Sequence, residues 1–265
     1  MELNNDNYYS RDANIEYMSV SQFKDFFGTY GTVGCEFCAL EKLENRWLEE
    51  PSTAMKVGSY VDAYFEGTLD DYKMKNPDMF KRDGELKADY IRAGNIIARA
   101  ERDPYFMQFM SGEKQVIMTG EIGGVPWKIK IDSYIPDTAI VDLKVMSTLT
   151  KANWVKDVGY LDFIRYWGYD YQGAVYQEIV RQNTGKKLPF YIAALSKEQE
   201  PDLQIIHVTD NFLEDALKIV EGNLPRVLDV KNHKQPPDRC EICDCCRSTK
   251  VLKKPISILD LMQAV

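Results

Sequence analysis

The chain has 265 residues and is 45% hydrophobic, an ordinary value for a globular protein with a sizeable core. Its formal net charge of −8 argues against a protein that coats nucleic acid through bulk electrostatics, because such domains are usually strongly basic. The N-terminal residues are polar and acidic with no apolar run behind them. They contain neither the pattern of a secretory signal nor that of a membrane helix. We therefore expect a cytoplasmic protein.

The charge is unevenly distributed along the chain. Residues 1–50 carry ten acids against four bases, whereas residues 226–254 carry eight bases against four acids. The basic segment is consistent with a local phosphate-facing surface, and equally with a solvated helix face and tail.

The first part of the chain predicts helices. Ser19 or Ser21 can cap a short helix through Lys24 and Phe27, and a glycine-rich connection follows. Apolar residues then recur at spacings of three and four, which is typical of amphipathic helices. The expected elements are helices at 35–49 and 53–67, a loop at 68–84, and two helices within 86–110 that Pro104 separates.

The rest of the chain alternates strands and helices. The expected elements are strands at 114–119 and 125–145, a helix at 161–182, strands at 188–196 and 203–209, and a helix at 210–232. This order predicts a mixed α/β sheet covered by helices in a single domain. We divide residues 1–265 into a mainly helical part (1–110), a sheet with its central helix (112–210), and a C-terminal helix with a cysteine-rich tail (211–265).

The segment 127–145 is the most informative. Pro136, Asp137 and Thr138 interrupt two alternating runs and predict a turn between antiparallel strands, which brings Asp132 opposite Asp142. Two adjacent carboxylates repel each other unless a cation lies between them, so this pair indicates a metal site.

Strand alternation extends this face. It places Lys144 beside Asp142, and Lys128 and Lys130 on the face of Asp132, while Val141, Leu143 and Val145 point into the core. Charged residues on the wet face of a hairpin remain an alternative interpretation.

Two helices carry further polar groups at a spacing of four. Asp62 and Glu66 follow Gly58 on one side of the first helix, so Asp62 is a candidate metal ligand, unless the glycine only makes a packing contact. Gln172 and Tyr176 share a face of the later helix, where an amide and a phenol can bond to phosphate or to a carboxylate.

In this order the motifs GSYVD (58–62), ID (131–132), VDLK (141–144) and QGAVY (172–176) resemble the PD-(D/E)XK nucleases of the RecB and phage exonuclease type. The resemblance covers roughly residues 19–250 and implies a restriction-endonuclease-like mixed sheet flanked by helices. It departs from the family pattern at Asp62, where many members have histidine.

The resemblance also implies roles for individual groups. Asp132, Asp142 and the carbonyl of Leu143 would bind Mg²⁺ or Mn²⁺, with Asp62 as a second-site ligand. Lys144 would orient the attacking water, and Gln172 and Tyr176 would position the DNA strand.

The cysteines form two groups: Cys35 with Cys38, and Cys240, Cys243, Cys245 and Cys246. Thiolates suit zinc or an iron–sulfur cluster, and free cysteines in a tail are the alternative. In some RecB-like nucleases an N-terminal cysteine and a C-terminal triad hold a [4Fe–4S] cluster. By that resemblance the ligands would be Cys35, Cys240, Cys243 and Cys246.

Three functions follow as hypotheses. The first is an Mg²⁺-dependent DNA exonuclease that acts on double-stranded ends in phage or prophage recombination, with a single-strand annealing protein as partner and a homo-oligomeric state implied by the resemblance. The second is a non-catalytic DNA-binding or recombination-accessory protein that keeps the nuclease fold. The third is a small interaction protein stapled by a metal at its cysteines.

Overall fold

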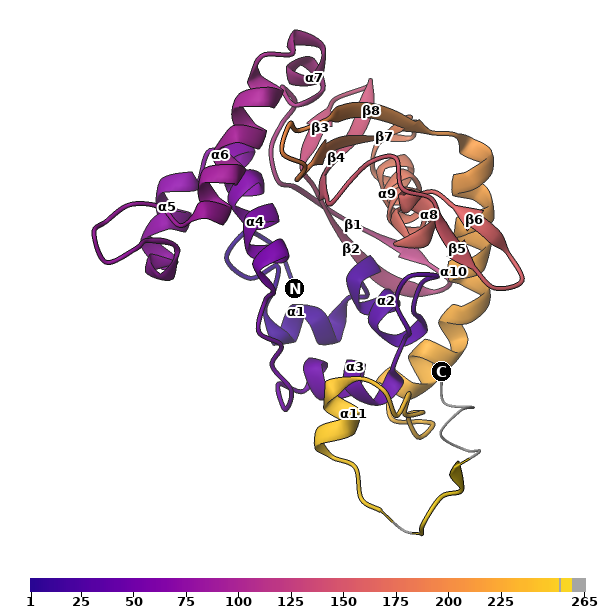
Figure 1. The fold of residues 1–265 in the computed structure, drawn as a ribbon. Coiled ribbons are helices and arrows are strands. Elements are labelled where there is room, and N and C mark those ends of the chain that lie inside the picture. The colour runs from indigo at the N-terminus through magenta and orange to yellow at the C-terminus, as the bar shows by residue number, and fades with distance from the viewer. Residues whose placement is uncertain (253, 259–265) are drawn as a thin grey trace.

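The computed structural model describes residues 1–252 and 254–258 (Figure 1). As expected, the first part of the chain is helical, and Ser19 caps its second helix by accepting a bond from the backbone N–H of Gln22. The helices are α1 (Arg11–Glu16), α2 (Val20–Phe27), α3 (Glu36–Leu43), α4 (Thr53–Glu66), α5 (Leu69–Lys75), the 3₁₀ turn η1 (Pro77–Met79), α6 (Ala88–Glu101) and α7 (Pro104–Phe109).

The later part builds a mixed sheet in the order β3-β4-β7-β8, in which only the β4–β7 pair is parallel. Strands β1 and β2 pair separately, as do β5 and β6. The elements are β1 (Val116–Ile122), β2 (Val125–Ile131), β3 (Ser133–Ile135), β4 (Ala139–Met146), β5 (Asn153–Val155), β6 (Gly159–Leu161), α8 (Phe163–Tyr166), α9 (Tyr169–Thr184), β7 (Phe190–Ser196), β8 (Leu203–Val208), α10 (Asp210–Lys231) and α11 (Asp244–Ser248).

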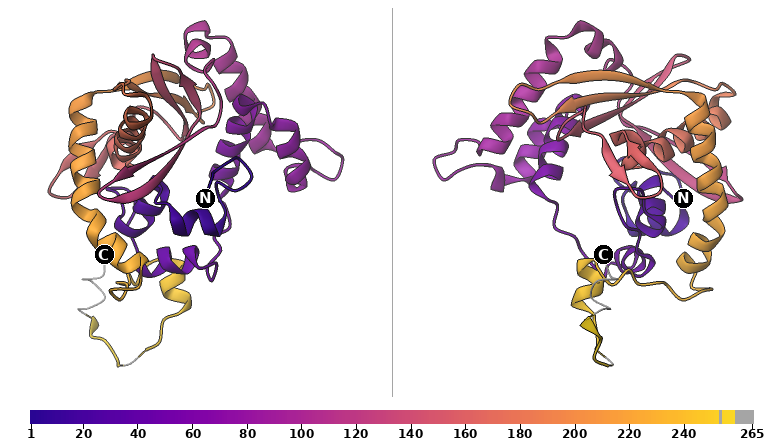
Figure 2. Two further views of the ribbon diagram at one scale, coloured as in Figure 1. Left: turned by 180° about the vertical axis from the view of Figure 1, so that it is seen from behind. Right: turned by 45° about the vertical axis from the view of Figure 1, so that its right-hand side comes forward.

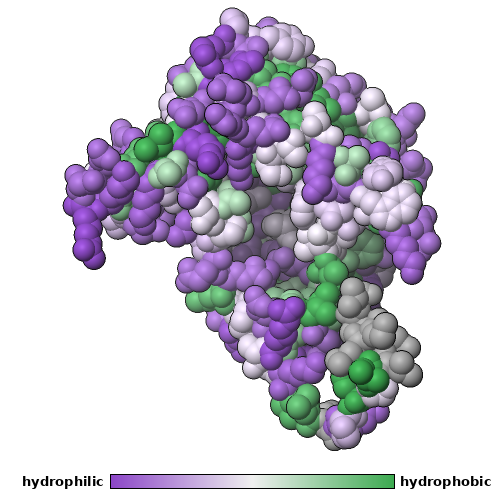
Figure 3. Space-filling model, in the orientation of Figure 1, coloured by the Kyte–Doolittle hydropathy of each residue, from purple (hydrophilic) through white to green (hydrophobic). Residues whose placement is uncertain are grey.

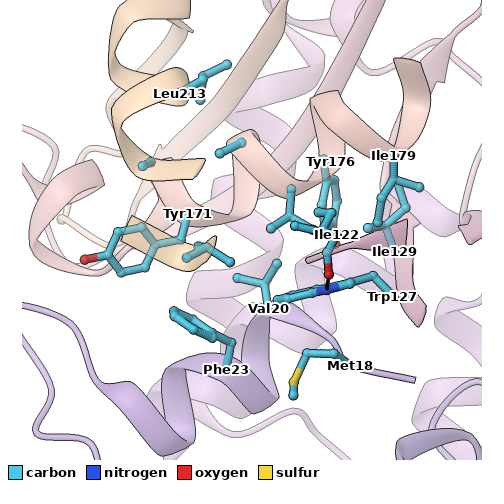
Figure 4. Close-up of a cluster of buried hydrophobic side chains, with 14 of the residues drawn as sticks. Met18, Val20, Phe23, Ile122, Trp127, Ile129, Tyr171, Tyr176, Ile179 and Leu213 are labelled. Atoms are coloured by element: carbon cyan, nitrogen blue, oxygen red, sulfur yellow. Dashed lines mark hydrogen bonds between the residues drawn. The ribbon is translucent and has the colours of Figure 1, made fainter. Parts of the chain in front are cut away.

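Helices cover both faces of the four-stranded sheet (Figures 1 and 2). On one face Ile140 and its neighbours pack against α9, α10 and α2, in a core that also contains the fully buried Trp127 (Figure 4). On the other face Val141 and Leu143 pack against α4 and α6. Because strand side chains alternate, β4 contributes to both cores, and its even-numbered residues face α9. The predicted inward direction of Val141, Leu143 and Val145 is confirmed.

Several elements differ from those that the sequence predicts. Residues 68–84 contain α5 and η1 as well as loops, because Leu69, Tyr72 and Met79 pack on the second core. The helix predicted at 35–49 ends at Leu43. The helix predicted at 161–182 is broken at Gly168, whose φ of 65° is left-handed. The hairpin β5–β6 was not predicted.

The described residues include no helix long and apolar enough to cross a membrane.

Candidate active site

The first strand of the predicted hairpin is divided into β2 and β3 at Asp132. The chain bends at Asp132, so that β2 before the bend pairs with β1, and β3 after it pairs with β4. In the β3–β4 register Ser133 lies opposite Val141. Continued by one residue, this register places Asp132 opposite Asp142, as the position of the turn predicts.

The Asp132 side chain takes the place of a backbone hydrogen-bond acceptor at the edge of β4. Its Oδ2 accepts a 2.9 Å bond from the backbone N–H of Leu143, which lies past the first β3–β4 pair, Ser133 with Val141. The N–H and C=O of one strand residue point to the same side, so the Leu143 carbonyl also faces the acidic pair. Lys144 Nζ lies 3.3 Å from this carbonyl oxygen.

Asp142 is 1% exposed and is held by two side chains. Gln172 of α9 donates a 2.6 Å bond to Oδ1, and Lys144 Nζ lies 2.5 Å from Oδ2. The Lys144 contact is an ion pair without good hydrogen-bond direction, and among the described residues Oδ2 has no hydrogen-bond donor. A buried carboxylate oxygen in this state has capacity for a further electropositive partner.

A second pair of acids faces this group. Asp62 and Glu66 of α4 line the same cleft of about 350 Å³ as Asp132, Asp142 and Lys144. No described atom lies within 4 Å of a Cβ placed on Gly58. A close packing contact therefore does not explain this glycine.

The electrostatics of the cleft follow from burial and from charge crowding. Burial, together with the neighbouring Asp142, raises the pKa of Asp132 well above its usual range. Burial, Glu66 and Asp142 likewise raise the pKa of Asp62 to about 7. Burial by itself would lower the pKa of Lys144, but the carboxylates of Asp142 and Asp132 outweigh it and raise that pKa.

The donor set fits a hard divalent cation. Asp132, Asp142 and the Leu143 carbonyl offer oxygen atoms, which Mg²⁺ and Mn²⁺ prefer. Among the described residues Lys144 is the one cation in ion-pair contact with this pair of carboxylates, and the raised pKa of Asp132 indicates that its charge does not compensate both of them. In the described chain no three acidic side chains bring carboxylate oxygens within 4.8 Å of one another, so Asp62 lines the cleft without joining Asp132 and Asp142 in one compact group.

Two side chains of helix α9 hold the residues of the acidic site through hydrogen bonds. Gln172 reaches Asp142 directly, whereas the hydroxyl of Tyr176, which is 8% exposed, donates a 3.0 Å bond to the Lys130 carbonyl. The predicted pair of an amide and a phenol therefore lines the cleft, but the hydroxyl of Tyr176 holds the end of β2.

Several cleft residues were not singled out from the sequence. Tyr8 and Tyr9 reach the cleft from the N-terminal segment, and Lys24 reaches it from α2. Gln115, whose φ is 54°, lies 3.4 Å from Asp132 Oδ1 through its amide nitrogen. None of them belongs to a periodic pattern or a short motif, and only the folding of distant segments places them here.

The cysteines form a second cluster, near the C-terminal end of α10. The sulfur atoms of Cys35, Cys240, Cys243 and Cys246 all lie within 4.8 Å of one another, with neighbouring separations of 3.5, 3.8 and 3.9 Å. These are the four residues chosen from the sequence. Cys38 and Cys245 are buried beside them but lie outside the group.

Backbone N–H groups point at these sulfur atoms. Cys35, Cys240 and Cys243 each accept a bond of 3.3–3.4 Å from the backbone N–H three residues later. Burial opposes ionisation, but the N–H groups of Ile242 and Cys243 lower the pKa of Cys240 to about 7. At Cys240 the surroundings therefore stabilise the thiolate, which is the form that binds metals, whereas burial raises the pKa of Cys35 and of Cys243.

The mixed sheet, its flanking helices and the acid–lysine group together define a PD-(D/E)XK nuclease fold, and the predicted fold class is confirmed. Residues 19–249 match the family described as a PDDEXK-like domain of unknown function (DUF3799), and the chain belongs to this family. It is also similar to the crystal structure of a protein from Eubacterium rectale that has been provisionally named an exonuclease. The two share 65% identity over 100% of each chain, with a TM-score of 0.98. No match was found among curated proteins.

Proposed function

We propose that this protein is a metal-dependent DNA exonuclease. The observation that carries the proposal is that Asp132, at the bend between β2 and β3, contacts Leu143 of β4, where Asp142 pairs with Lys144. The provisional exonuclease name of the similar Eubacterium rectale structure also supports it.

Each residue then has a defined task. Asp132, Asp142 and the Leu143 carbonyl would hold Mg²⁺ or Mn²⁺, which when bound stabilises the charge that develops on the attacking and leaving oxygens of a phosphodiester. Lys144 would keep its proton and orient the attacking water by placing a positive charge beside it. Gln172 fixes the orientation of Asp142, and Tyr176 fixes the end of β2.

The resemblance supplies the finer parts of the proposal. They are action at double-stranded ends, a place in phage or prophage recombination, a single-strand annealing protein as partner, a homo-oligomeric state and a cytoplasmic location. Each of these points can be tested separately from the chemistry.

Incubation with linear and with closed circular duplex DNA tests the activity, in Mg²⁺ and in EDTA. We expect linear DNA to be degraded only with Mg²⁺, and circular DNA to remain intact because it offers no end. Degradation of the circle would indicate an endonuclease. An intact linear substrate in both Mg²⁺ and Mn²⁺ would contradict nuclease activity.

A second candidate, a non-catalytic DNA-binding or recombination-accessory protein, is favoured by one observation. The pKa of Asp62 is raised to about 7 through burial and the neighbouring acids, so near neutral pH this group is partly protonated and a weaker cation ligand. DNA binding together with Mg²⁺ binding, but without cleavage at pH 8.5, would support this candidate.

We also propose that Cys35, Cys240, Cys243 and Cys246 hold a metal centre. The resemblance implies a [4Fe–4S] cluster, whereas the sulfur separations of 3.5–3.9 Å match the edge of a single tetrahedral site. Zinc–sulfur bonds of about 2.3 Å give tetrahedron edges of about 3.8 Å. Metal analysis and an absorption spectrum of anaerobically purified protein separate the two centres. Absorbance near 400 nm would indicate an iron–sulfur cluster. One equivalent of zinc without that absorbance would exclude the cluster.

A further inference from the structure

Three lysines around the acidic cleft have no acidic partner. In the described part of the chain Lys24, Lys114 and Lys130 form no ion pair, although the protein carries a net charge of −8. Lys24 Nζ donates to the Trp167 carbonyl at 3.2 Å, and Lys114 Nζ contacts the Met110 carbonyl. Carbonyl contacts orient an ammonium group but leave its charge uncompensated.

These lysines lie on both sides of the acidic pair. Lys24 lines the cleft of the acidic pair and lies 5.3 Å from the ring centre of Tyr169, while Lys144 lies 5.0 Å from the same centre. Lys24 is therefore one aromatic ring away from Lys144. Lys130 lines the same cleft, and it also lines the adjoining hollow of about 470 Å³, in which Lys114 lies.

The two hollows form one groove. Glu66, Gln115 and Lys130 line both of them, so the groove continues past the acidic pair from Lys24 towards Lys114. The space-filling view shows a hollow in the middle of this face (Figure 3). Asp142 at its floor is only 1% exposed, so a phosphate has to enter the groove to reach it. A single strand can bend into such a groove, and its unpaired bases are free to stack on aromatic side chains.

An exposed aromatic ring stands at the groove. Tyr9 is 72% exposed, and Lys130 Nζ lies 5.3 Å from its ring centre. The segment before it is anchored, because Lys128 Nζ contacts the Tyr8 carbonyl and donates a 2.7 Å bond to Asn14 Oδ1. An exposed ring on an anchored segment offers a stacking surface for a nucleobase.

We propose that one DNA strand lies along this groove, with phosphates contacted by Lys24 on one side of the acidic pair and by Lys130 and Lys114 on the other, and with a base stacked on Tyr9. The proposal rests on the proposed function, because it places the scissile phosphate above Asp132 and Asp142. It adds the substrate form at the site, a separated strand, and the residues that hold it.

Binding of a fluorescent single-stranded oligonucleotide, measured in EDTA over a range of salt concentrations, tests the groove without cleavage. Each lost phosphate contact on a single strand reduces the slope of log K against log salt by about 0.7. We expect this reduction for Lys24→Gln and for Lys130→Gln, and no reduction for Lys24→Arg. The control Lys218→Gln, on the exposed side of α10, should leave the slope unchanged.

The stacking contact has its own pair of variants. Tyr9→Ala should weaken oligonucleotide binding by about fivefold or more, whereas Tyr9→Phe should bind like the wild type, because the ring remains. In turnover on linear duplex, the lysine variants should raise KM more than they lower kcat.

The outcomes separate this inference from the proposed function. Slopes for Lys24→Gln and Lys130→Gln equal to that of Lys218→Gln, in folded proteins with wild-type melting temperatures, would overturn the groove even if the wild type cleaves DNA. Reduced slopes in a protein that never cleaves DNA would support the groove and contradict the nuclease.

Discussion

Asp142 is a buried side chain to which the proposed function assigns a chemical task beside its structural one. It is 1% exposed, it accepts a bond from Gln172, and it pairs with Lys144, yet one of its oxygens lacks a hydrogen-bond donor among the described residues. Structural needs alone would favour a residue whose polar atoms are all satisfied. The unsatisfied oxygen is therefore consistent with the metal-binding role that we propose for Asp142.

We predict that Asp142→Asn abolishes DNA degradation and keeps the fold. The amide can still accept from Gln172, but it removes the charge that holds Lys144 and a cation, and the loss of one preorganised group costs about 10²–10³ in rate. Degradation of linear duplex in Mg²⁺ measures the rate, and circular dichroism checks the fold. The exposed Asp215→Asn serves as control, and a variant as fast as wild type would refute the role of Asp142.

Asp62 predicts a pH dependence of stability in the absence of divalent ions. Its pKa is about 7 in the folded protein, because of burial and the nearby acids, against about 3.9 in an unfolded chain. Between these values the folded state holds the proton and the unfolded state has lost it, so stability falls as pH rises from about 4 to 7.

Melting curves in EDTA at pH 5 and pH 8 compare the wild type with Asp62→Asn. The variant should gain melting temperature relative to the wild type at pH 8 and gain less at pH 5. An equal difference at both values would show that Asp62 ionises normally in the folded protein.

At the scale of elements, the alternation of polar and apolar side chains predicts where a strand lies. The ends of a helix depend in addition on its tertiary contacts. Strand β4 was predicted because polar and apolar side chains alternate along it: Val141, Leu143 and Val145 face one core, while Asp142 and Lys144 line the cleft. Helix α5 was missed because it has no fully buried residue and no side-chain cap. The break at Gly168 was missed because apolar spacing continues across it from Ile164 to Tyr171, and only the left-handed backbone ends α8.

Helix α10 is joined to the N-terminal helices by a buried lysine. Lys231 Nζ donates to the Asn14 carbonyl at 2.8 Å, and to the Tyr17 carbonyl and Gln22 Oε1 at 3.0 Å. We predict that Lys231→Met lowers the free energy of unfolding by about 2–4 kcal/mol, because these buried acceptors lose a charged donor. Lys218→Met on the exposed side of the same helix should change it by less than about 0.5 kcal/mol.

Urea denaturation of both variants measures this difference. Equal midpoints for Lys231→Met and Lys218→Met would show that water replaces the lysine at no cost, and that other contacts hold α10 against α1 and α2.

For the whole molecule, the cysteine cluster joins segments that are more than two hundred residues apart. Cys35 caps the start of α3. Cys240 precedes α11, Cys243 caps its start and Cys246 lies within it, and α11 packs on α3 (Figure 1). Helix α3 in turn packs on α2, which carries Lys24 into the cleft. A metal at the cysteines would therefore stabilise one wall of the active site from a distance.

We predict that Cys35→Ser loses the bound metal and melts at least about 5 °C below the wild type, because metal binding is coupled to folding. Cys38→Ser should keep the metal, since Cys38 lies outside the group of four. Metal analysis and thermal melting provide the two readouts. Full metal content in Cys35→Ser would remove this residue from the ligand set.

The sequence by itself determined the local parts of this protein. Asp132 and Asp142 are ten residues apart across one turn, so strand geometry alone predicts that they meet, and Gln172 and Tyr176 share a face because helices repeat every 3.6 residues. The tertiary structure decided which distant groups join them. Lys24, Tyr9 and Asp62 reach the cleft from three segments that only the packing of two cores brings together, and no periodicity encodes such long-range contacts.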